Sequence, residues 1–403
     1  MNREKIFEEL SVRNEKKIVL LIMDGVGGLP LNGKTALEAA KKPNLNALAE
    51  RSSCGRTIPV LPGITPGSGP AHFSLFGYDP IKYNVGRGIL EALGIDVDVH
   101  EHEVVARGNF CTIDREGIVT DRRAGRIPTE KNREIIKLLS ENIKEIDGVK
   151  ISLYSGKEHR FVIKLKHPEL SDKISDADPQ KEGLPIKFPE PLENNEKAEF
   201  TANIVTKFMK KAIVVLKDSH PANALLLRGF SEYPKIPPMQ KIFKLNPAAI
   251  ANYPMYRGLA KLVGMNVLEV GPEIDDEIIT LKKEWNNYDF FYIHIKKTDS
   301  YGEDGNFENK VKIIEKVDQI LPEILSLNPD AIAITGDHST PCKISGHSWH
   351  PNPFLLYSPY IIKDDVKIFT EKECAKGIYG TFPATDILPL LLANTLKLKK
   401  YGA

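Results

Sequence analysis

The sequence predicts an α/β fold, with a mainly parallel β-sheet flanked by helices and a separate α+β unit inserted into it. Short runs of consecutive apolar residues recur near both ends of the chain, as expected for strands buried on both faces of a parallel sheet. Segments with helical spacing alternate with these runs. Between residues 95 and 239 the pattern changes to short strands with turns and two longer helices.

The composition is that of an ordinary globular protein. A length of 403 residues allows a large core and more than one domain. The 55 basic and 54 acidic side chains leave a net charge of +1, which argues against nucleic acid or an anionic membrane as a partner. No apolar run approaches the roughly 18 residues of a transmembrane helix. Scattered cysteines and a charged N-terminus without a signal-peptide core favour a cytoplasmic protein.

The first predicted strand is the apolar run Lys17–Met23, and Asp24 follows it directly. Ligands bind at the carboxyl ends of parallel strands, so Asp24 is a candidate metal or phosphate-site residue. A structural aspartate that caps the turn is the alternative. The glycines at 25, 27 and 28 lack dinucleotide-binding spacing, and Asp24 would repel a pyrophosphate.

Ser68 lies in a segment rich in glycine and proline, Gly63–Tyr78. Pro70 suits the first turn of a helix, so Ser68 is expected at a helix N-terminus. Free amides and the helix dipole stabilise an anion there. The alternative is a plain N-cap serine. The flanking glycines allow close approach of a ligand and favour a nucleophile.

A second candidate segment follows the apolar run at residues 330–334. It contains the adjacent pair Asp337 and His338, with His347 nine residues after His338. These side chains offer oxygen and nitrogen ligands to a divalent metal. The alternative is a polar loop whose histidines cap turns. His294 lies inside another apolar run and is expected to be a core or supporting histidine, not a ligand.

The inserted unit carries a cluster of basic residues. Arginine forks match the geometry of carboxylate and phosphate, as a small anionic substrate requires. A solvated basic turn is the alternative. Two hinge connections, near residues 86–95 and 236–246, would let the unit act as a cap. The basic residues are Arg107, Arg122, Arg123, Arg126, His159 and Arg160.

These motifs resemble the alkaline phosphatase superfamily. More narrowly, Pro66–His72 and Thr335–Cys342 resemble the archaeal-type, cofactor-independent (2,3-bisphosphoglycerate-independent) phosphoglycerate mutases. The resemblance extends from about residue 17 to residue 397. It implies an alkaline-phosphatase-like, metal-binding core of residues 1–94 and 240–403 and a substrate-binding cap of residues 95–239.

The resemblance implies an isomerase of glycolysis and gluconeogenesis that interconverts 3- and 2-phosphoglycerate through a phosphoserine at Ser68. It needs two divalent ions and no 2,3-bisphosphoglycerate, with Mn²⁺ expected and Mg²⁺, Co²⁺ and Zn²⁺ as alternatives. One ion would take Asp24, Ser68, Asp337 and His338. The other would take Asp299, Glu303 and His347. Glu303 replaces the histidine of the family's D-x-x-G-H motif, which favours Mn²⁺ or Mg²⁺ over Zn²⁺ and leaves open whether His350 substitutes.

The resemblance also implies that some of the cap's basic residues hold the glycerate, with Asp121 as a proton shuttle. Arg257 would reach the phosphate, or else lie on a helix surface. The alternatives on the same core are a metal-dependent phosphatase or phosphonate hydrolase, a homoserine-type kinase, and a non-catalytic protein. The expected partner is a small phosphoglycerate, and the sequence leaves open whether the chain forms a homo-oligomer.

Overall fold

The structure, a computed structural model, describes residues 3–83 and 85–402. It divides into two compact units. The first, which we call the core unit, comprises Met1–Asn84 and Ile236–Ala403. The second, which we call the inserted unit, comprises Val85–Lys235.

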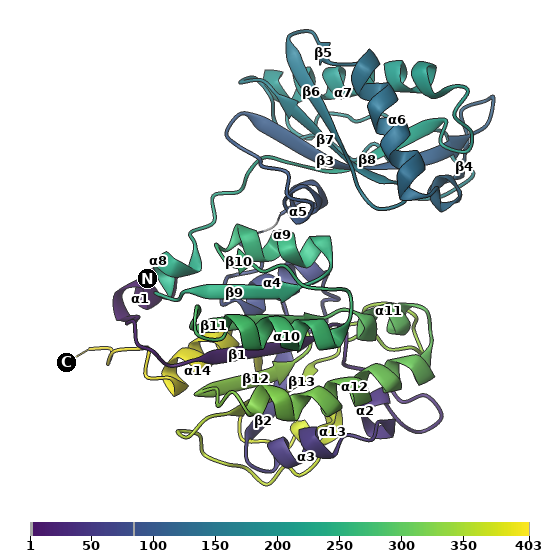
Figure 1. The fold of residues 1–403 in the computed structure, drawn as a ribbon. Helices are drawn as coiled ribbons and strands as arrows, with labels where there is room; N and C mark the ends of the chain where they lie inside the picture. The colour runs from purple at the N-terminus through teal and green to yellow at the C-terminus, as the bar shows by residue number, and fades with distance from the viewer. Residues whose placement is uncertain (1–2, 84, 403) are drawn as a thin grey trace. The chain divides into compact units, whose positions relative to one another are not determined.

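The core unit is built on an eight-stranded sheet in the order β10-β9-β11-β1-β12-β13-β2-β14 (Figure 1). The central strand β1 runs parallel to both neighbours, β11 and β12, while β13 is antiparallel to β12 and β2. This confirms the predicted α/β class with a mainly parallel sheet. The strands are β1 Ile18–Met23, β2 Ser53–Ile58, β9 Pro247–Ala251, β10 Asn266–Val267, β11 Phe290–Ile295, β12 Ala331–Thr335, β13 Asn352–Tyr357 and β14 Thr381–Pro383.

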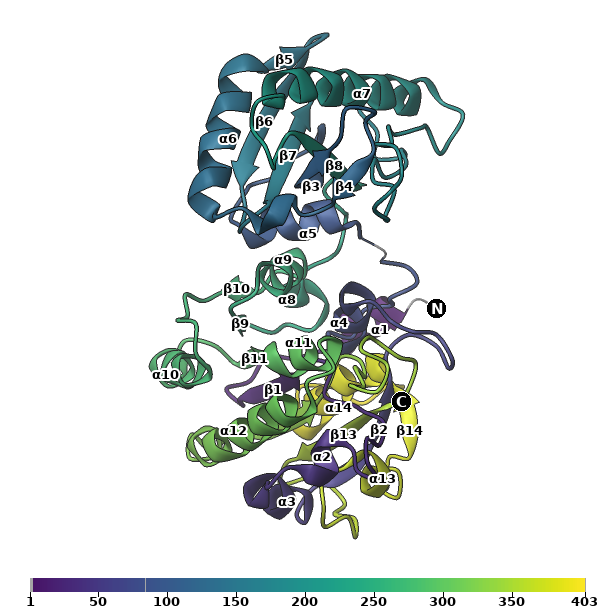
Figure 2. The same cartoon turned by 90° about the vertical axis from the view of Figure 1, so that its right-hand side faces the viewer.

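Helices flank this sheet (Figure 2). Alternate side chains of a strand such as β1 face opposite ways. Val19, Leu21 and Met23 pack with apolar residues of α3, α10 and α12 in one buried cluster. The whole of β1 is buried, which explains its uninterrupted apolar sequence. The helices are α1 Arg3–Leu10, α2 Ala36–Ala39, α3 Pro43–Ala49, α4 Ser68–Leu75, α8 Met239–Ile242, α9 Pro254–Leu262, α10 Ile274–Glu284, α11 Lys297–Glu303, α12 Phe307–Leu325, α13 Glu371–Cys374 and α14 Ile387–Asn394, with the 3-10 turn η2 at Ala384–Asp386.

The inserted unit has its own antiparallel sheet, in which β3 pairs with β4, β7 and β8 (Figure 1). Apolar residues of α6 and α7 pack with this sheet in a second buried cluster. Across the part of the chain that the structure describes, no helix has the length and apolarity needed to cross a membrane. The elements are α5 Arg87–Gly94, β3 Glu103–Ile113, β4 Val119–Asp121, η1 Ala124–Arg126, α6 Thr129–Asn142, β5 Glu145–Ile146, β6 Val149–Ser155, β7 Arg160–Lys166, α7 Glu196–Leu216 and β8 Ala224–Ser231.

The short helix α5 falls in the inserted unit, although the sequence analysis placed residues up to 94 in the first domain. Its packing explains this position. A Cβ at Gly88 would lie 2.4 Å from the carbonyl oxygen of Gly229 and 2.6 Å from that of Val105. The absence of a side chain at Gly88 therefore lets α5 lie directly on the backbone of β3 and β8.

Candidate functional site

Three neighbouring parallel strands end at the candidate site. Met23 of β1 is in register with Ile295 of β11, and Ile22 is in register with Thr335 of β12. The loops that follow these strands therefore start at the same edge of the sheet. Asp24 is in the first loop, Asp299 and Glu303 follow the second strand, and Asp337 and His338 follow the third.

Asp24, Asp337 and His338 form the first potential metal-binding group, with ligand atoms within 4.8 Å of one another. The Nε2 atom of His338 lies 3.4 Å from Asp24 Oδ1 and 3.2 Å from Asp337 Oδ2. Both carboxylate oxygens are buried, and neither has a hydrogen-bond partner among the described residues. Buried, unpartnered carboxylate oxygens beside an imidazole fit a divalent cation.

Ser68 is the first residue of α4, and its hydroxyl lies 3.3 Å from His338 Nε2. The preceding Gly67 has an extended backbone (φ −82°, ψ 158°), and Pro70 occupies the first turn. The helix therefore begins at the serine. Its first turn, where the backbone amides lack helical partners, therefore begins beside His338 of the first metal-binding group.

Asp299, His338 and His347 form the second potential metal-binding group. Asp299 Oδ1 is 3.5 Å from His347 Nε2, and the rings of His338 and His347 stack with centroids 3.7 Å apart. Thr340 Oγ1 donates a 2.6 Å hydrogen bond to Asp299 Oδ1. His338 thus belongs to both groups, whereas the sequence analysis assigned it to one.

Glu303 borders the second group without belonging to it. Its Oε1 lies 3.7 Å from His347 Nε2, and 54% of its side chain is exposed. Burial and the charge of Asp299 raise the pKa of Glu303. His350 belongs to neither group: its Nδ1 lies 3.0 Å from Ser348 Oγ, and its ring stacks on Trp349.

The charges at this edge are unbalanced. Burial and the nearby Asp24 carboxylate raise the pKa of Asp337 well above its ordinary value. Burial alone would also raise the pKa of Asp24, but the Lys296 ammonium, followed by His294 and His338, holds it well below its ordinary value. Asp24, Asp299 and Asp337 are all buried, and Lys296 pairs with two of them, Asp24 and Asp299. The excess negative charge suits divalent cations.

Three residues of this site had no assigned role in the sequence analysis. Lys296 Nζ lies 3.0 Å from Asp24 Oδ2 and 2.5 Å from Asp299 Oδ2. The hydroxyl of Tyr256, on α9, donates to Asp24 Oδ2. Lys310, buried on α12, donates to the carbonyl oxygens of Gly25 (2.7 Å) and Thr340 (2.8 Å), and so joins two site loops. The position of Lys296 directly after β11 is a sequence signal; Tyr256 and Lys310 lie within helices and give none.

The inserted unit holds an electropositive cluster. Burial lowers the pKa of Arg107 to about 10; Glu91 opposes this shift, and Arg160, Arg87 and Arg228 add to it. The pKa of His159 is lowered to about 4, first by burial and then by the positive charges of Arg160, Arg123, Arg107 and Arg126. These cationic side chains therefore lie close together around a neutral histidine. Such a cluster is suited to an anion.

Some predicted substrate residues already have protein partners. Arg122 makes a bidentate contact with Asp178, through Nε (3.2 Å) and a terminal nitrogen (2.6 Å). Asp121 accepts hydrogen bonds from the backbone N–H groups of Arg123 (2.7 Å) and Gly125 (2.6 Å), so it caps a turn. In the core unit, a terminal nitrogen of Arg257 lies 3.3 Å from Glu269 Oε1.

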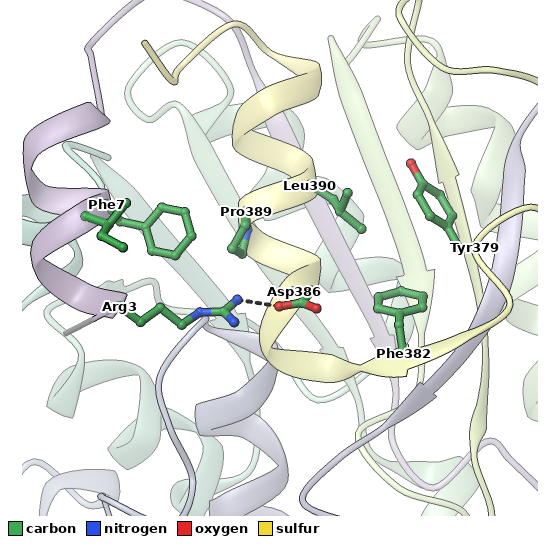
Figure 3. Close-up of a pocket in the computed structure, with 8 residues that line it drawn as sticks. Arg3, Phe7, Tyr379, Phe382, Asp386, Pro389 and Leu390 are labelled. Carbon is green, nitrogen blue, oxygen red and sulfur yellow. Dashed lines mark hydrogen bonds and ion pairs between the residues drawn. The ribbon is translucent and has the colours of Figure 1, made fainter. Parts of the chain in front are cut away.

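A pocket of about 470 Å³ lies elsewhere on the core unit, between α1 and the C-terminal segment (Figure 3). Phe7, Phe382 and Leu390 contribute apolar walls, and Arg3 pairs with Asp386 at 2.5 Å. The residues of the two potential metal-binding groups do not line it. We therefore do not assign the candidate chemistry to this pocket.

Comparisons with known sequences identify close relatives. A family model described as 2,3-bisphosphoglycerate-independent phosphoglycerate mutase matches residues 49–223. A Thermotoga maritima protein named as a probable enzyme of this kind is 57% identical over 402 residues, covering 100% of both chains. A Thermus thermophilus protein with the same name is 51% identical over 403 residues, covering 99% of both. The similarity therefore spans the core and inserted units.

Two solved structures are also similar. A cofactor-independent phosphoglycerate mutase from Thermoplasma acidophilum is 30% identical, with a TM-score of 0.71; the match covers 94% of this chain and 100% of that one. A Pyrococcus horikoshii protein is 30% identical, with a TM-score of 0.82, and covers 96% of this chain and 100% of its own.

Proposed function

The chain belongs to the 2,3-bisphosphoglycerate-independent phosphoglycerate mutase family, and from this we propose that it is an isomerase that interconverts 3- and 2-phosphoglycerate without 2,3-bisphosphoglycerate. The observation that supports this most is the position of the Ser68 hydroxyl, 3.3 Å from His338 Nε2 and at the start of α4. A serine at a helix N-terminus beside potential metal ligands is suited to accept a phosphoryl group. We further propose a cytoplasmic role in glycolysis and gluconeogenesis.

We propose that two divalent ions bind at the edge of the core sheet. Asp24, Ser68, Asp337 and His338 would hold one, and Asp299, Glu303 and His347 would hold the other, with His338 in contact with both groups. Mn²⁺ is the proposed ion because oxygen donors predominate. Bound divalent ions would lower the pKa of the serine hydroxyl and neutralise charge on the phosphoryl oxygens.

In the first half-reaction, Ser68 Oγ attacks the phosphorus of 3-phosphoglycerate. The bond between phosphorus and the C3 oxygen breaks, the serine proton is lost, and the C3 oxygen takes up a proton to give glycerate. The free amides at the start of α4 stabilise the phosphoryl oxygens of phosphoserine. Arg257, on the core unit, is a proposed phosphate ligand.

In the second half-reaction, the 2-hydroxyl of glycerate loses its proton and attacks the phosphorus of phosphoserine. The bond between phosphorus and Ser68 Oγ breaks, Oγ takes up a proton, and 2-phosphoglycerate forms. The glycerate must stay bound between the two steps, because attack by water would make the enzyme a phosphatase. We propose that the basic side chains of the inserted unit retain it through its carboxylate. Asp121 is the proposed proton carrier for the glycerate hydroxyls.

The function is tested by following 3-phosphoglycerate with Mn²⁺ present and 2,3-bisphosphoglycerate absent. We expect 2-phosphoglycerate to form, a chelator to stop the reaction, and added Mn²⁺ to restore it. Ser68→Ala should reduce turnover to background because it removes the nucleophile. Thr65→Ala, at an exposed position in the loop that precedes α4, is the matched control and should keep full activity. Activity in Ser68→Ala would contradict the mechanism.

A further inference from the structure

Tyr256 is fully buried on α9, and its hydroxyl meets three groups of the candidate site. It donates a hydrogen bond to Asp24 Oδ2 and lies 3.3 Å from Lys296 Nζ. Burial raises the pKa of this hydroxyl, and the side chain of Ser68 lies near enough to oppose that rise. The ring is held in place by His294, with centroids 3.6 Å apart and planes inclined by 28°. One rigid phenol thus binds a proposed metal ligand and lies near the proposed nucleophile.

These contacts give the two oxygens of Asp24 different surroundings. Oδ2 is contacted by Tyr256, by Lys296 at 3.0 Å and by His294 Nε2 at 3.3 Å. Oδ1 is buried without a hydrogen-bond partner among residues 3–83 and 85–402, and it lies 3.4 Å from His338 Nε2. The contacts at Oδ2 therefore leave Oδ1 turned towards His338, which belongs with Asp24 to the first potential metal-binding group.

We propose that Tyr256 is a positioning residue for phosphoryl transfer, whose hydroxyl fixes the Asp24 carboxylate next to the nucleophile Ser68. This proposal rests on the proposed function, since it concerns the formation of phosphoserine at Ser68. A nucleophile held in one orientation avoids the entropy cost of finding the attacking geometry. A fixed carboxylate likewise binds a metal more tightly than a mobile one.

Tyr292 provides a matched control in the same aromatic cluster. It is also fully buried, and its ring lies 5.9 Å from that of His294 and 5.7 Å from that of His72. Its hydroxyl has no hydrogen-bond partner within the described part of the chain. Tyr256→Phe and Tyr292→Phe therefore each delete one buried hydroxyl from one cluster, but only the first deletes a hydrogen bond to a residue of the site.

The experiment measures phosphoserine at Ser68 by rapid quenching after mixing wild type and each variant with 3-phosphoglycerate and saturating Mn²⁺. For Tyr256→Phe we expect phosphoserine formation and kcat to fall about 10–100-fold, and Mn²⁺ to bind about tenfold more weakly. The KM for 3-phosphoglycerate and the melting temperature should stay near the wild-type values. Tyr292→Phe should match wild type in all five measurements.

The inference is overturned if Tyr256→Phe forms phosphoserine at the wild-type rate and binds Mn²⁺ equally well. It is also overturned if both variants lose rate and melting temperature alike, because the hydroxyl would then act only through packing. A wild-type protein that turns over 3-phosphoglycerate without phosphoserine contradicts the proposed function itself. The wild-type measurement therefore separates failure of the function from failure of the Tyr256 role.

Discussion

The two units of the chain carry opposite electrostatic imbalances. At the sheet edge of the core unit, Asp24 and Asp337 are both buried, and the charge of Asp24 helps to raise the pKa of Asp337. In the inserted unit, Arg107 and the neutral His159 lie among further arginines. Like charges held together in a poorly solvated place cost stability. The first imbalance therefore suits divalent cations, and the second suits an anionic ligand.

This contrast indicates how the family's two tasks are divided. The acidic edge is built on strand ends and on α4, all parts of one sheet-based framework, which suits a group that must hold reacting atoms in place. The basic cluster includes a turn residue, Arg123, and strand residues such as Arg107 and Arg160. We infer that transfer belongs to the core unit and retention of glycerate to the inserted unit.

The largest expected effect comes from removing one charge at the acidic edge. Asp337→Asn keeps an acceptor oxygen for the 3.0 Å bond from Gly25 N–H but removes the negative charge. We expect activity to fall by about 10³-fold, because a ligand of the proposed metal is lost. In a chelator, however, the variant should melt at a higher temperature than wild type. Each kcal/mol recovered would raise the melting temperature by about 2–4 °C.

The pH dependence of the stabilisation expected in Asp337→Asn follows from the direction in which folding shifts the pKa of Asp337. The pKa of Asp337 is raised on folding, so the folded state disfavours its charged form. The free-energy cost of holding the charged form in the folded state is absent below the unfolded-state pKa of about 3.9. It grows as the pH rises above that pKa. The stabilisation should therefore be largest near neutral pH and shrink towards about pH 4. Asp275→Asn, on the exposed surface of α10, is the control; a destabilised Asp337→Asn would refute the charge argument.

A smaller effect is expected at the edge of the second group. Glu303→His restores the imidazole of the D-x-x-G-H motif next to His347, from which Glu303 Oε1 is 3.7 Å away. Nitrogen ligands favour Zn²⁺ over Mn²⁺, so the ratio of Zn²⁺ to Mn²⁺ affinity should rise about tenfold. Competitive titration of the two ions measures this ratio. If the ratio does not change, residue 303 lies outside the reach of the metal.

Much of the fold was predictable, because buried parallel strands leave a clear mark in sequence. The apolar run Lys17–Met23 corresponds to β1, and the run at 330–334 corresponds to β12. The position of α5 was not predictable in this way. Its assignment depends on close contact between Gly88 and the backbone at Gly229, far away in sequence. Neither composition nor periodicity records such a contact.

The residues of the candidate site also differ in whether the sequence alone could predict their positions. Asp24 and Asp337 follow apolar runs directly, so strand ends alone place them at one edge. The hydrogen bond from Tyr256 to Asp24 joins residues 232 positions apart and depends on how α9 packs on the sheet. The bidentate pairing of Arg122 with Asp178 is likewise a tertiary contact. The sequence could therefore identify the basic residues but not which of them already had a partner.

The division of labour between the units is tested most directly by the ratio of free glycerate to 2-phosphoglycerate produced from 3-phosphoglycerate. Arg107→Met removes one guanidinium from the basic cluster and leaves the acidic edge unchanged in sequence. Arg133→Met, at an exposed position on α6, is the matched control. We predict that Arg107→Met raises the ratio about tenfold by weakening retention of glycerate, while Arg133→Met does not change it. An unchanged ratio in Arg107→Met, with unchanged KM, would contradict the account.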